Sequence, residues 1–411
     1  MRVLFTTWAA SAHLYSLIPL AWAFVTAGHE VRIASQPALA SPLVATGLPG
    51  VTLGSDIDVA ALNERAGSAA APVEIFRHDP ETLSWEQMRR GYELFRLAVE
   101  AFNDPLVDDL VRFARHWRPD LVVWDPMTFA GAIAARACGA PDARLLMGLD
   151  VWTPMRQRYL KLLQEQPASE RVDPVGDWVA ETLRRFGLPF DEQALTGRWS
   201  IDQHPADLRS SATPGLVPMR YVPVNGNTLV PRWLSAPPTA PRVCLSLGIS
   251  RGEFKDLPEI SAEQAADIVA ALADLDVEVV ATLPPEVIDP VPPNTRVVPY
   301  VPLHALLPTC AVMVSHAGTG TSSNALLCGV PQVLAPRDFD TPLRAARLVE
   351  LGAAITVSFD GITGAEVRDA VRRTLDDQSY QDNARRLRQQ VLAEPSPAEV
   401  VGLFSRWTAG E

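Results

Sequence analysis

The sequence predicts an α/β protein with two doubly wound domains, each a parallel sheet that helices cover on both faces. Three observations predict this architecture. The chain has 411 residues, more than one ordinary hydrophobic core requires. Short apolar strands alternate with amphipathic helices, a pattern typical of parallel sheets. The same strand–loop–helix–strand order occurs at residues 2–35 and again at residues 241–283.

The first of these units is read from its apolar pattern. The stretch "RVLFTT" at 2–7 is short, apolar and bounded by small residues, as buried parallel strands are. A loop, "WAASAH", follows at 8–13. Apolar residues then recur at helical spacing over 14–25, Gly28 ends the helix, and "VRIAS" at 31–35 is the next strand.

The second unit repeats the order with little sequence in common. We predict a strand at 241–248, a loop at 249–261, an amphipathic helix at 262–275 and a strand at 276–283. The two units lie far apart in the chain, so we expect each to build its own sheet.

The domain boundaries follow from the proline-rich segment that precedes the second unit. We predict an N-terminal domain at 1–221, a linker at 222–241 and a C-terminal domain at 242–394. Residues 151–215 are assigned to outer helices and loops of the first domain. A final helix, "PAEVVGLFSRW", falls within 395–411.

Composition excludes several classes of protein. A net charge of −12 without basic blocks is unsuited to nucleic acids and anionic membranes. Thr, Ser and His residues interrupt the apolar opening, which argues against a signal peptide, and no uninterrupted apolar run reaches the length of a membrane span. Four cysteines without a C-x-x-C pair indicate reduced thiols in a cytoplasmic protein. They are Cys138, Cys244, Cys310 and Cys328.

Three polar residues follow predicted strands: His13, Asp125 and His316. Ligands of open parallel sheets bind beyond the carboxyl ends of the strands, so we expect all three to face one interdomain cleft. His13 is interpreted as a general base or, alternatively, as a helix-entry histidine bonded to backbone. Asp125 is interpreted as its carboxylate partner or as the N-cap of a helix at 126–137.

A loop rich in glycine and hydroxyl groups lies at the end of a strand and enters a helix at 315–331. The N–H groups at such a helix start favour anions, and glycines let an anion come close. We interpret the loop as a pyrophosphate cradle, with a tight structural turn as the alternative. It matches neither the Walker loop nor the G-x-G-x-x-G fingerprint. Its candidate ligand contacts are His316, Gly318, Thr319, Gly320, Thr321 and Ser322.

Asp-x-Asp triplets occur at 56–58, 274–276 and 338–340. Such triplets can hold Mg²⁺ on a nucleotide diphosphate. The first two are expected in solvated turns. The third follows a strand, but it has no further metal ligands nearby in the sequence. We therefore expect Asp340 to accept a hydrogen bond from a substrate hydroxyl, and we predict no metal site.

The stretch "SHAGTGTSSNALLCGVPQVLAPRDFDTPLRAARLVELGAAI" resembles the donor-binding signature of inverting glycosyltransferases of the GT-B fold. The resemblance is closest to actinobacterial enzymes that attach deoxysugars to macrolide and anthracycline polyketides. Further matches, such as "TAGHEVRIASQPAL" and "WDPMTFAGAIAARACGA", extend it over nearly the whole chain. It implies two Rossmann-like domains facing across an interdomain cleft, with the final helix crossing back to the first domain.

The resemblance also implies the substrates and the residues that contact them. The N-terminal domain would hold a hydrophobic aglycone, and the C-terminal domain a nucleotide sugar, most often a dTDP-deoxysugar, with no other cofactor. By position, His13 matches the catalytic base and Asp125 its acidic partner. The donor contacts that match are Pro302 and Leu303 for the nucleobase, His316, Gly318, Thr319, Gly320 and Thr321 for the diphosphate, and Asp340 and Thr341 for sugar hydroxyls.

The sequence departs from the family pattern at three places, one of which is the loop before His13, where "AASA" stands in place of the glycine of many relatives. Thr341 stands where the superfamily often has Gln, which fits a sugar with fewer hydroxyls. Ser315 stands where close relatives often carry a second histidine. Aromatic residues of the first half are candidates for the acceptor pocket, although aromatics at helical spacing are usually core. They are Trp8, Phe76, Trp85, Phe95, Phe129 and Trp152.

Two other functions stay open at this point. One is a non-catalytic protein of the same fold that assists an antibiotic glycosylation system, and the other is a nucleotide-sugar epimerase. Some members of the branch need an auxiliary activator protein, and a homodimer is a state that the sequence leaves open.

Overall fold

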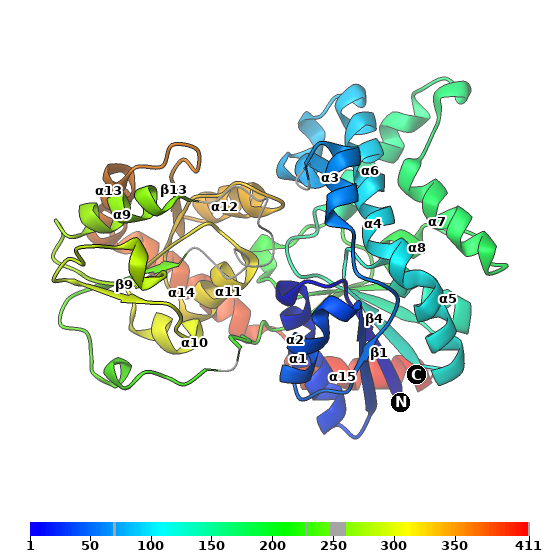
Figure 1. Cartoon of the computed structure of the whole chain (residues 1–411), viewed down its shortest axis with the longest axis horizontal. Coiled ribbons are helices and arrows are strands. Elements are labelled where there is room, and N and C mark those ends of the chain that lie inside the picture. Colours follow the sequence, from blue (N-terminus) through cyan, green and yellow to red (C-terminus); the bar gives the residue numbers. More distant parts are fainter. Residues whose placement is uncertain (69–70, 227, 247–259, 410–411) are drawn as a thin grey trace. The chain divides into compact units, whose positions relative to one another are not determined.

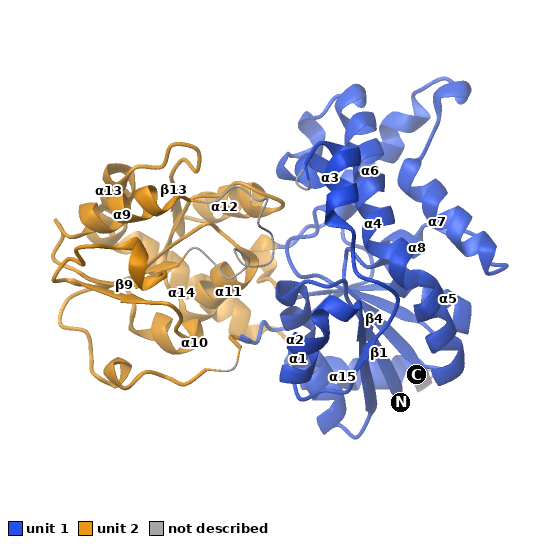
Figure 2. Cartoon of the chain, in the orientation of Figure 1, with its two compact units in different colours: residues 1–203, 209–224, 395–411 blue, residues 204–208, 225–394 orange. Residues whose placement is uncertain are grey.

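The computed structural model describes residues 1–68, 71–226, 228–246 and 260–409 (Figure 1). The chain divides into two compact units (Figure 2). Unit 1 comprises residues 1–203, 209–224 and 395–411, and unit 2 comprises residues 204–208 and 225–394.

Unit 1 contains a seven-stranded, wholly parallel sheet in the order β3-β2-β1-β4-β5-β6-β7. The order runs outward in both directions from the pair β1–β4, which makes this pair the topological switch point. The strands are β1 Arg2–Thr6, β2 Glu30–Ser35, β3 Gly50–Thr52, β4 Leu121–Trp124, β5 Asp142–Leu145, β6 Trp199–Asp202 and β7 Leu216–Pro218.

Helices cover both faces of this sheet, because successive strand side chains point to opposite faces. In β1, Val3 and Phe5 enter one core with α1 and α15, and Leu4 enters the other with α4 to α7. The helices are α1 Ser11–Thr26, α2 Ala40–Ala45, α3 Val59–Ala66, α4 Trp85–Trp117, α5 Phe129–Cys138, α6 Trp152–Gln164, α7 Pro174–Arg185, α8 Gln193–Thr196 and α15 Pro397–Ala409.

Unit 2 repeats the plan with six parallel strands in the order β10-β9-β8-β11-β12-β13. Its switch point is the pair β8–β11. The strands are β8 Arg242–Ser246, β9 Glu278–Thr282, β10 Thr295–Val298, β11 Val312–Ser315, β12 Gln332–Leu334 and β13 Ala354–Thr356. The helices are α9 Ala262–Leu272, α10 Leu303–Leu306, α11 Thr319–Cys328, α12 Thr341–Glu350, α13 Gly364–Asp376 and α14 Gln378–Ala393.

The two doubly wound parallel sheets confirm the predicted fold class. Two local predictions were wrong. The loop expected at 8–13 ends early, because α1 begins at Ser11 with the bond from Leu14 N–H to Ala10 O (3.1 Å). The segment 151–215 holds a strand, β6, as well as outer helices. Only Ile260 and Ser261 of the loop expected at 249–261 are described; the rest lies outside the described residues.

Part of the predicted linker packs within unit 2. Leu234, in the short 3₁₀ helix Arg232–Ser235, is buried in the core that contains Met313 of β11. The segment 204–208 also belongs to unit 2, where the Asp207 carboxylate accepts bonds from Arg386 Nη1 (2.6 Å) and Gln390 Nε2 (2.8 Å). The predicted domain boundaries stay predictions.

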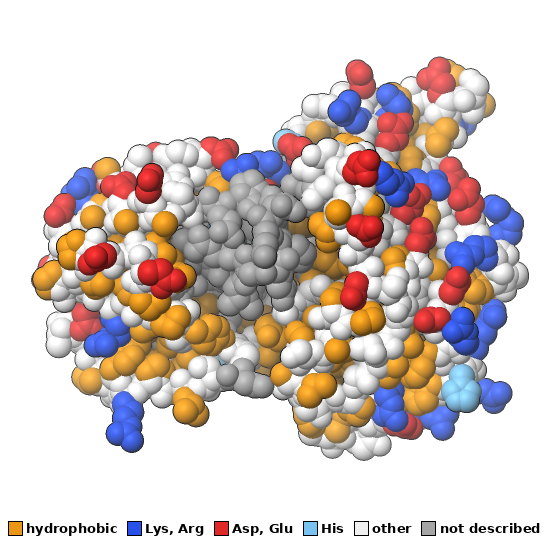
Figure 3. All heavy atoms as spheres, in the orientation of Figure 1, with side chains coloured by type: hydrophobic (Ala, Val, Ile, Leu, Met, Phe, Trp, Pro, Cys, Tyr) orange, Lys and Arg blue, Asp and Glu red, His pale blue; other side chains and the backbone are white. Residues whose placement is uncertain are grey.

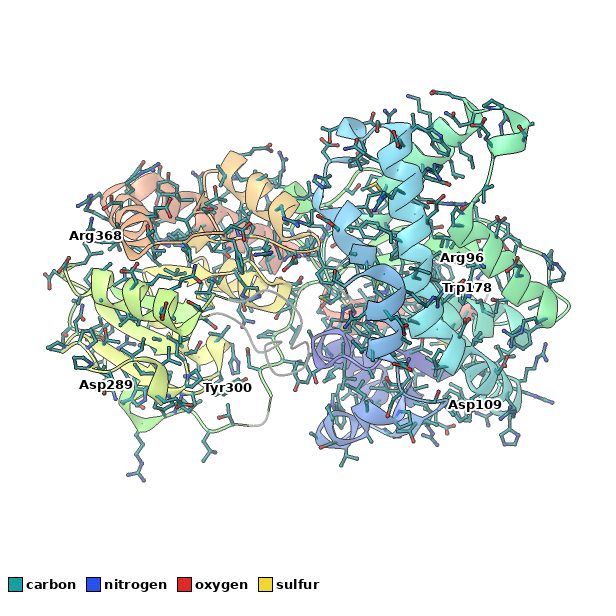
Figure 4. All side chains as sticks on the ribbon, turned by 45° about the horizontal axis from the view of Figure 1, so that its top comes forward. Arg96, Asp109, Trp178, Asp289, Tyr300 and Arg368 are labelled. Atoms are coloured by element: carbon teal, nitrogen blue, oxygen red, sulfur yellow. The ribbon has the colours of Figure 1, made fainter. Side chains whose placement is uncertain are left out.

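The long helix α4 is anchored to α7 at two positions. Arg96 and Trp178, both labelled in Figure 4, lie at this contact. Arg96 Nη1 donates to Pro174 O (3.1 Å), and Trp178 Nε1 donates to Asp104 Oδ1 (3.0 Å). Burial raises the pKa of the Asp104 carboxyl, despite the bond from Trp178. These bonds join α4 to α7, and Phe102 O in the middle of α4 accepts a bond from Gln36 Nε2 (2.9 Å), the residue that follows β2.

All four cysteines are free thiols, as predicted. Burial raises the pKa of Cys310 to about 12 and that of Cys328 to about 11, so both stay protonated and weakly nucleophilic near neutral pH.

Acidic and basic side chains are interspersed on the visible face of unit 1 (Figure 3). No helix in the described part of the chain is both long enough and apolar enough to cross a bilayer.

Candidate active site

His13 and Asp125 meet at the switch point of unit 1. Their strands are adjacent and in register, with Thr6 opposite Trp124, so the segments that follow β1 and β4 begin next to each other at the same edge of the sheet. His13 Nδ1 lies 2.6 Å from Asp125 Oδ2. The His13 side chain is 12% exposed and the Asp125 side chain is fully buried. The histidine therefore presents its ring to solvent at one edge and to a carboxylate at the other.

The two oxygens of Asp125 have different partners. Oδ2 takes His13, whereas Oδ1 accepts the Met127 N–H (2.9 Å) in the turn that follows β4. The N-cap of α5 is Thr128, so the alternative interpretation of Asp125 as a helix N-cap was wrong. Because a buried carboxylate is costly without hydrogen bonds, these donors hold it in one orientation.

The other ring nitrogen of His13, Nε2, makes no hydrogen bond to any residue that the structure describes. The Trp8 ring packs edge-on against the imidazole, with ring centroids 5.0 Å apart. A carboxylate that accepts the Nδ1–H selects the tautomer with a lone pair on Nε2. The arrangement can therefore remove a proton from a group that approaches Nε2.

The loop after β11 enters α11 as expected, with Gly318 as N-cap and Thr319 as the first helical residue. The first bond of the helix joins Ser322 N–H to Gly318 O (2.9 Å), so the N–H groups of the first turn point out of the helix end. This completely described helix has no acidic residue in its first turn. Its N-terminus is thus suited to an anion.

The two glycines of this loop differ in their surroundings. A Cβ atom on Gly318 would lie 2.3 Å from His316 Nε2, so the histidine ring packs where a side chain would stand. A Cβ atom on Gly320 would meet nothing within 4 Å, and Gly320 is exposed. Ser315, which stands at the position of the second histidine, accepts the Ala317 N–H on its Oγ (3.2 Å). Its hydroxyl therefore supports the turn.

The buried guanidinium of Arg344 in α12 binds this loop through hydrogen bonds. Its Nη1 donates to Ala317 O (2.8 Å), and its Nη2 donates to Thr319 Oγ1 (2.8 Å) and to the Asp340 carboxylate. Ala317 has a φ of 65°, which costs energy for a residue other than glycine and persists only under tertiary constraint. Arg344 supplies such a constraint, and the sequence analysis missed it. The signal was its place four residues after Asp340, on the same helix face.

Asp340 and Thr341 lie where α12 begins, Asp340 in the N-cap position. Thr341 Oγ1 donates to Asp338 O (2.7 Å) and accepts the Arg337 N–H (3.1 Å). A hydroxyl has one proton and two lone pairs, so Thr341 retains only acceptor capacity. Asp340 is the ion-pair partner of Arg344, a role that the sequence analysis did not assign to it.

The remaining predicted residues are the two candidates for the nucleobase contact and the six aromatic candidates for the acceptor pocket. Pro302 is the buried N-cap of α10 and Leu303 is half-buried. Five of the six candidate aromatic residues are buried, and Trp85 is half-buried; Phe76, Phe95, Phe129 and Trp152 form one aromatic cluster with Tyr92. Within the described residues, no group of three or more His, Cys, Asp and Glu side chains is arranged to hold a metal ion.

Family models place this geometry among known proteins. The N-terminal domain model of the erythromycin biosynthesis protein CIII-like family matches residues 22–248, and its C-terminal domain model matches residues 266–406. The chain belongs to the CIII-like family. The chain is 43% identical to 3-alpha-mycarosylerythronolide B desosaminyl transferase of Saccharopolyspora erythraea, over 100% of this chain and 99% of that protein.

One further curated relative and one solved structure are also glycosyl-transferring proteins by name. The chain is 40% identical to the aclacinomycin-T 2-deoxy-L-fucose transferase of Streptomyces galilaeus, over 100% of this chain and 96% of that protein. The crystal structure of glycosyltransferase VinC in complex with dTDP superposes with a TM-score of 0.88 at 38% identity, covering 100% of both chains. The fold is therefore GT-B, and this CIII-like protein is a glycosyltransferase.

We predict strong energetic coupling between Arg344 and Asp340. Arg344→Gln and Asp340→Asn should each cost about 3–5 kcal/mol of unfolding free energy, because each leaves a buried charge unpaired. The double variant should cost less than the sum by at least about 1 kcal/mol. Urea unfolding of the four proteins measures the cycle.

The pair Arg89 and Glu93 is a matched control, because it has the same spacing but side chains about half exposed (48% and 49%). Its coupling should be at most about 0.5 kcal/mol. Equal coupling in the two pairs would contradict the buried role of Arg344.

Proposed function

We propose that the chain is an inverting glycosyltransferase that moves a deoxysugar from a nucleotide sugar, specifically a dTDP-sugar, to a hydroxyl group of a polyketide-type aglycone. The observation that carries the proposal is the 2.6 Å contact between His13 Nδ1 and Asp125 Oδ2, because it orients Nε2 as a proton acceptor. The names of the relatives, which transfer desosamine and 2-deoxy-L-fucose, and the dTDP complex of VinC support the substrate classes.

The proposed reaction is a single displacement. Nε2 of His13 takes the proton of the acceptor hydroxyl while that oxygen attacks the anomeric carbon. The bond between this carbon and the diphosphate oxygen breaks, and the nucleoside diphosphate leaves with the electron pair. Asp125 stabilises the imidazolium that forms. Configuration inverts because the one attack comes from the face opposite the leaving group.

The donor is proposed to bind unit 2. Its diphosphate would rest on the first turn of α11, with His316, Gly318, Thr319, Gly320 and Thr321 as contacts. The helix N-terminus stabilises the charge that develops on the leaving diphosphate, so the proposal requires no metal or other cofactor. Pro302 and Leu303 would contact the nucleobase, and Asp340 and Thr341 the sugar hydroxyls. The acceptor-only capacity of Thr341 favours a sugar hydroxyl that donates.

The proposal extends to partners and location. Four free thiols are typical of a reducing compartment, which favours the cytoplasm. A hydrophobic aglycone is the proposed acceptor. An auxiliary activator protein and a second copy of the chain are candidate partners, so activity is best assayed with and without a cognate activator, and the chain sized by light scattering.

The test of the proposed function is a screen of dTDP-deoxysugars against polyketide aglycones with the purified chain. We expect a mass gain of one deoxyhexosyl residue on the aglycone and release of dTDP only when both substrates are present. Donor conversion without an acceptor, or failure of every pair even with an activator protein, would contradict the proposal.

Removal of the base should abolish most turnover. His13→Ala should lower kcat by about 10²–10⁴-fold, the usual contribution of a general base. Asp125→Asn should lower kcat at least about tenfold, because an amide N–H donated to Nδ1 places the proton on Nε2, the wrong tautomer. Steady-state kinetics with circular dichroism measures both.

His78→Ala serves as the matched control, because His78 is an exposed histidine of the same unit. It should keep full turnover. A folded His13→Ala variant with wild-type kcat would overturn the proposed role of His13.

A methyl group on Gly320 should weaken donor binding without harming the fold. Gly320→Ala adds a Cβ in open space, and alanine is the better helix former by about 1 kcal/mol, so the melting temperature should stay or rise. The methyl group would meet the diphosphate, so the donor KM should rise about tenfold, which corresponds to about 1.4 kcal/mol.

Gly402→Ala in α15 is the control, because a Cβ there meets only Arg406 Nη1 at 3.8 Å. It should also keep or raise the melting temperature but leave the donor KM unchanged. An unchanged donor KM for Gly320→Ala would argue against a diphosphate at this helix end.

A further inference from the structure

The middle of α4 contacts the surroundings of both His13 and Asp125 through two consecutive residues. The Phe102 ring stacks on Trp8 with centroids 4.5 Å apart and planes 12° apart. Trp8 in turn packs edge-on against His13, at 5.0 Å between centroids. The indole is therefore held between the α4 side chain and the imidazole, which limits the positions the imidazole ring can take.

Asn103, the next residue, binds the turn that carries Asp125. Its fully buried carboxamide donates from Nδ2 to Met127 O (3.1 Å) and to Val99 O (2.8 Å), and its Oδ1 accepts the Ala130 N–H (2.9 Å). The Met127 N–H is the group that donates to Asp125 Oδ1 (2.9 Å). Met127 is thus held at its N–H by Asp125 and at its carbonyl by Asn103.

The turn depends on this help from outside. The N-cap of α5, Thr128, makes no side-chain capping bond within the described part of the chain. The Ala130 N–H is one of the first-turn donors that a cap normally satisfies, and Asn103 satisfies it from another helix. Without the carboxamide, the buried Ala130 N–H and the partly buried Met127 C=O would lose this partner.

The α4 segment is itself fixed to a third strand end. Gln36, which directly follows β2 and is fully buried, donates from Nε2 to Phe102 O (2.9 Å). The segment therefore connects the residues that follow β2, β1 and β4, which are three adjacent strands of this sheet.

We infer that Phe102 and Asn103 are positioning residues for the pair His13–Asp125: one side chain acts on the imidazole through Trp8, the other on the carboxylate through Met127. The inference rests on the proposed function of that pair. Neither residue contacts His13 or Asp125 by a hydrogen bond of its own in the described structure. Proton transfer depends steeply on the placement of the base, so loss of either support should slow the chemical step and leave substrate binding intact.

The experiment combines variants of α4 with removal of the base. Asn103→Ser and Phe102→Leu are each made in the wild-type chain and in His13→Ala, and kcat and both KM values are measured. In the wild-type background we expect kcat to fall at least about tenfold, with each KM within about twofold. In the His13→Ala background the same changes should lower the residual kcat by less than about twofold, because no base remains to be positioned.

Two further variants separate positioning from general loss of stability. Phe102→Tyr keeps the stacked ring and should retain kcat. Asn294→Ser is the matched control for Asn103: the Asn294 Nδ2 group also donates to two carbonyls, Leu272 O (3.3 Å) and Val277 O (3.1 Å), but in unit 2. It should lower the melting temperature and leave kcat unchanged.

The outcomes distinguish failure of this inference from failure of the proposed function. Equal fold losses in both backgrounds, a rise in KM with unchanged kcat, or full turnover of the α4 variants would overturn this inference alone. Full turnover of His13→Ala would overturn the proposed function and the inference with it. If Asn103→Ser does not fold, the comparison of Phe102→Leu with Phe102→Tyr decides, because equal turnover of those two would overturn the inference.

Discussion

The hydrogen bond between His13 and Asp125 depends on the adjacency of two parallel strands whose residues lie far apart in the chain. The two residues are separated by 112 positions. They meet because β1 and β4 pair in register at the point where the strand order of the sheet reverses. At such a point the connections leave toward opposite faces of the sheet and open a crevice, which the first residues after both strands line. Strand order is thus the constraint on which this site depends.

Both units stabilise their strand-end segments with a buried charged side chain. In unit 1 the Asp125 carboxylate accepts from His13 and from the Met127 N–H. In unit 2 the Arg344 guanidinium donates to Ala317 O, Thr319 Oγ1 and Asp340. Such charges are costly to bury unless they are hydrogen-bonded, and this cost restricts them to a narrow range of geometries. Because these side chains are costly to bury without hydrogen bonds, the loops that supply those bonds are restricted to the geometries that satisfy them.

Each unit carries one of the two candidate sites. Unit 1 has a histidine paired with a buried carboxylate, and unit 2 has a helix end with positive partial charge and an exposed glycine. The site of each unit lies at its own switch point, after β1 and β4 in one and after β11 in the other.

The sequence by itself determined the alternation of strands and helices, the two parallel sheets, and the residues that follow the strands, because period and composition are local properties of the chain. It also identified the loop before α11 from its glycines and hydroxyls. Tertiary structure alone decided which strands are neighbours. It thereby decided between the two roles open to Asp125, in favour of the contact with His13 over the helix N-cap. It also decided that α1 begins before His13, that Arg344 holds the loop through Ala317, and that Asn103 caps α5 from another helix. These are contacts between distant segments, and a buried hydrogen-bonding group leaves no periodic trace in the sequence around it.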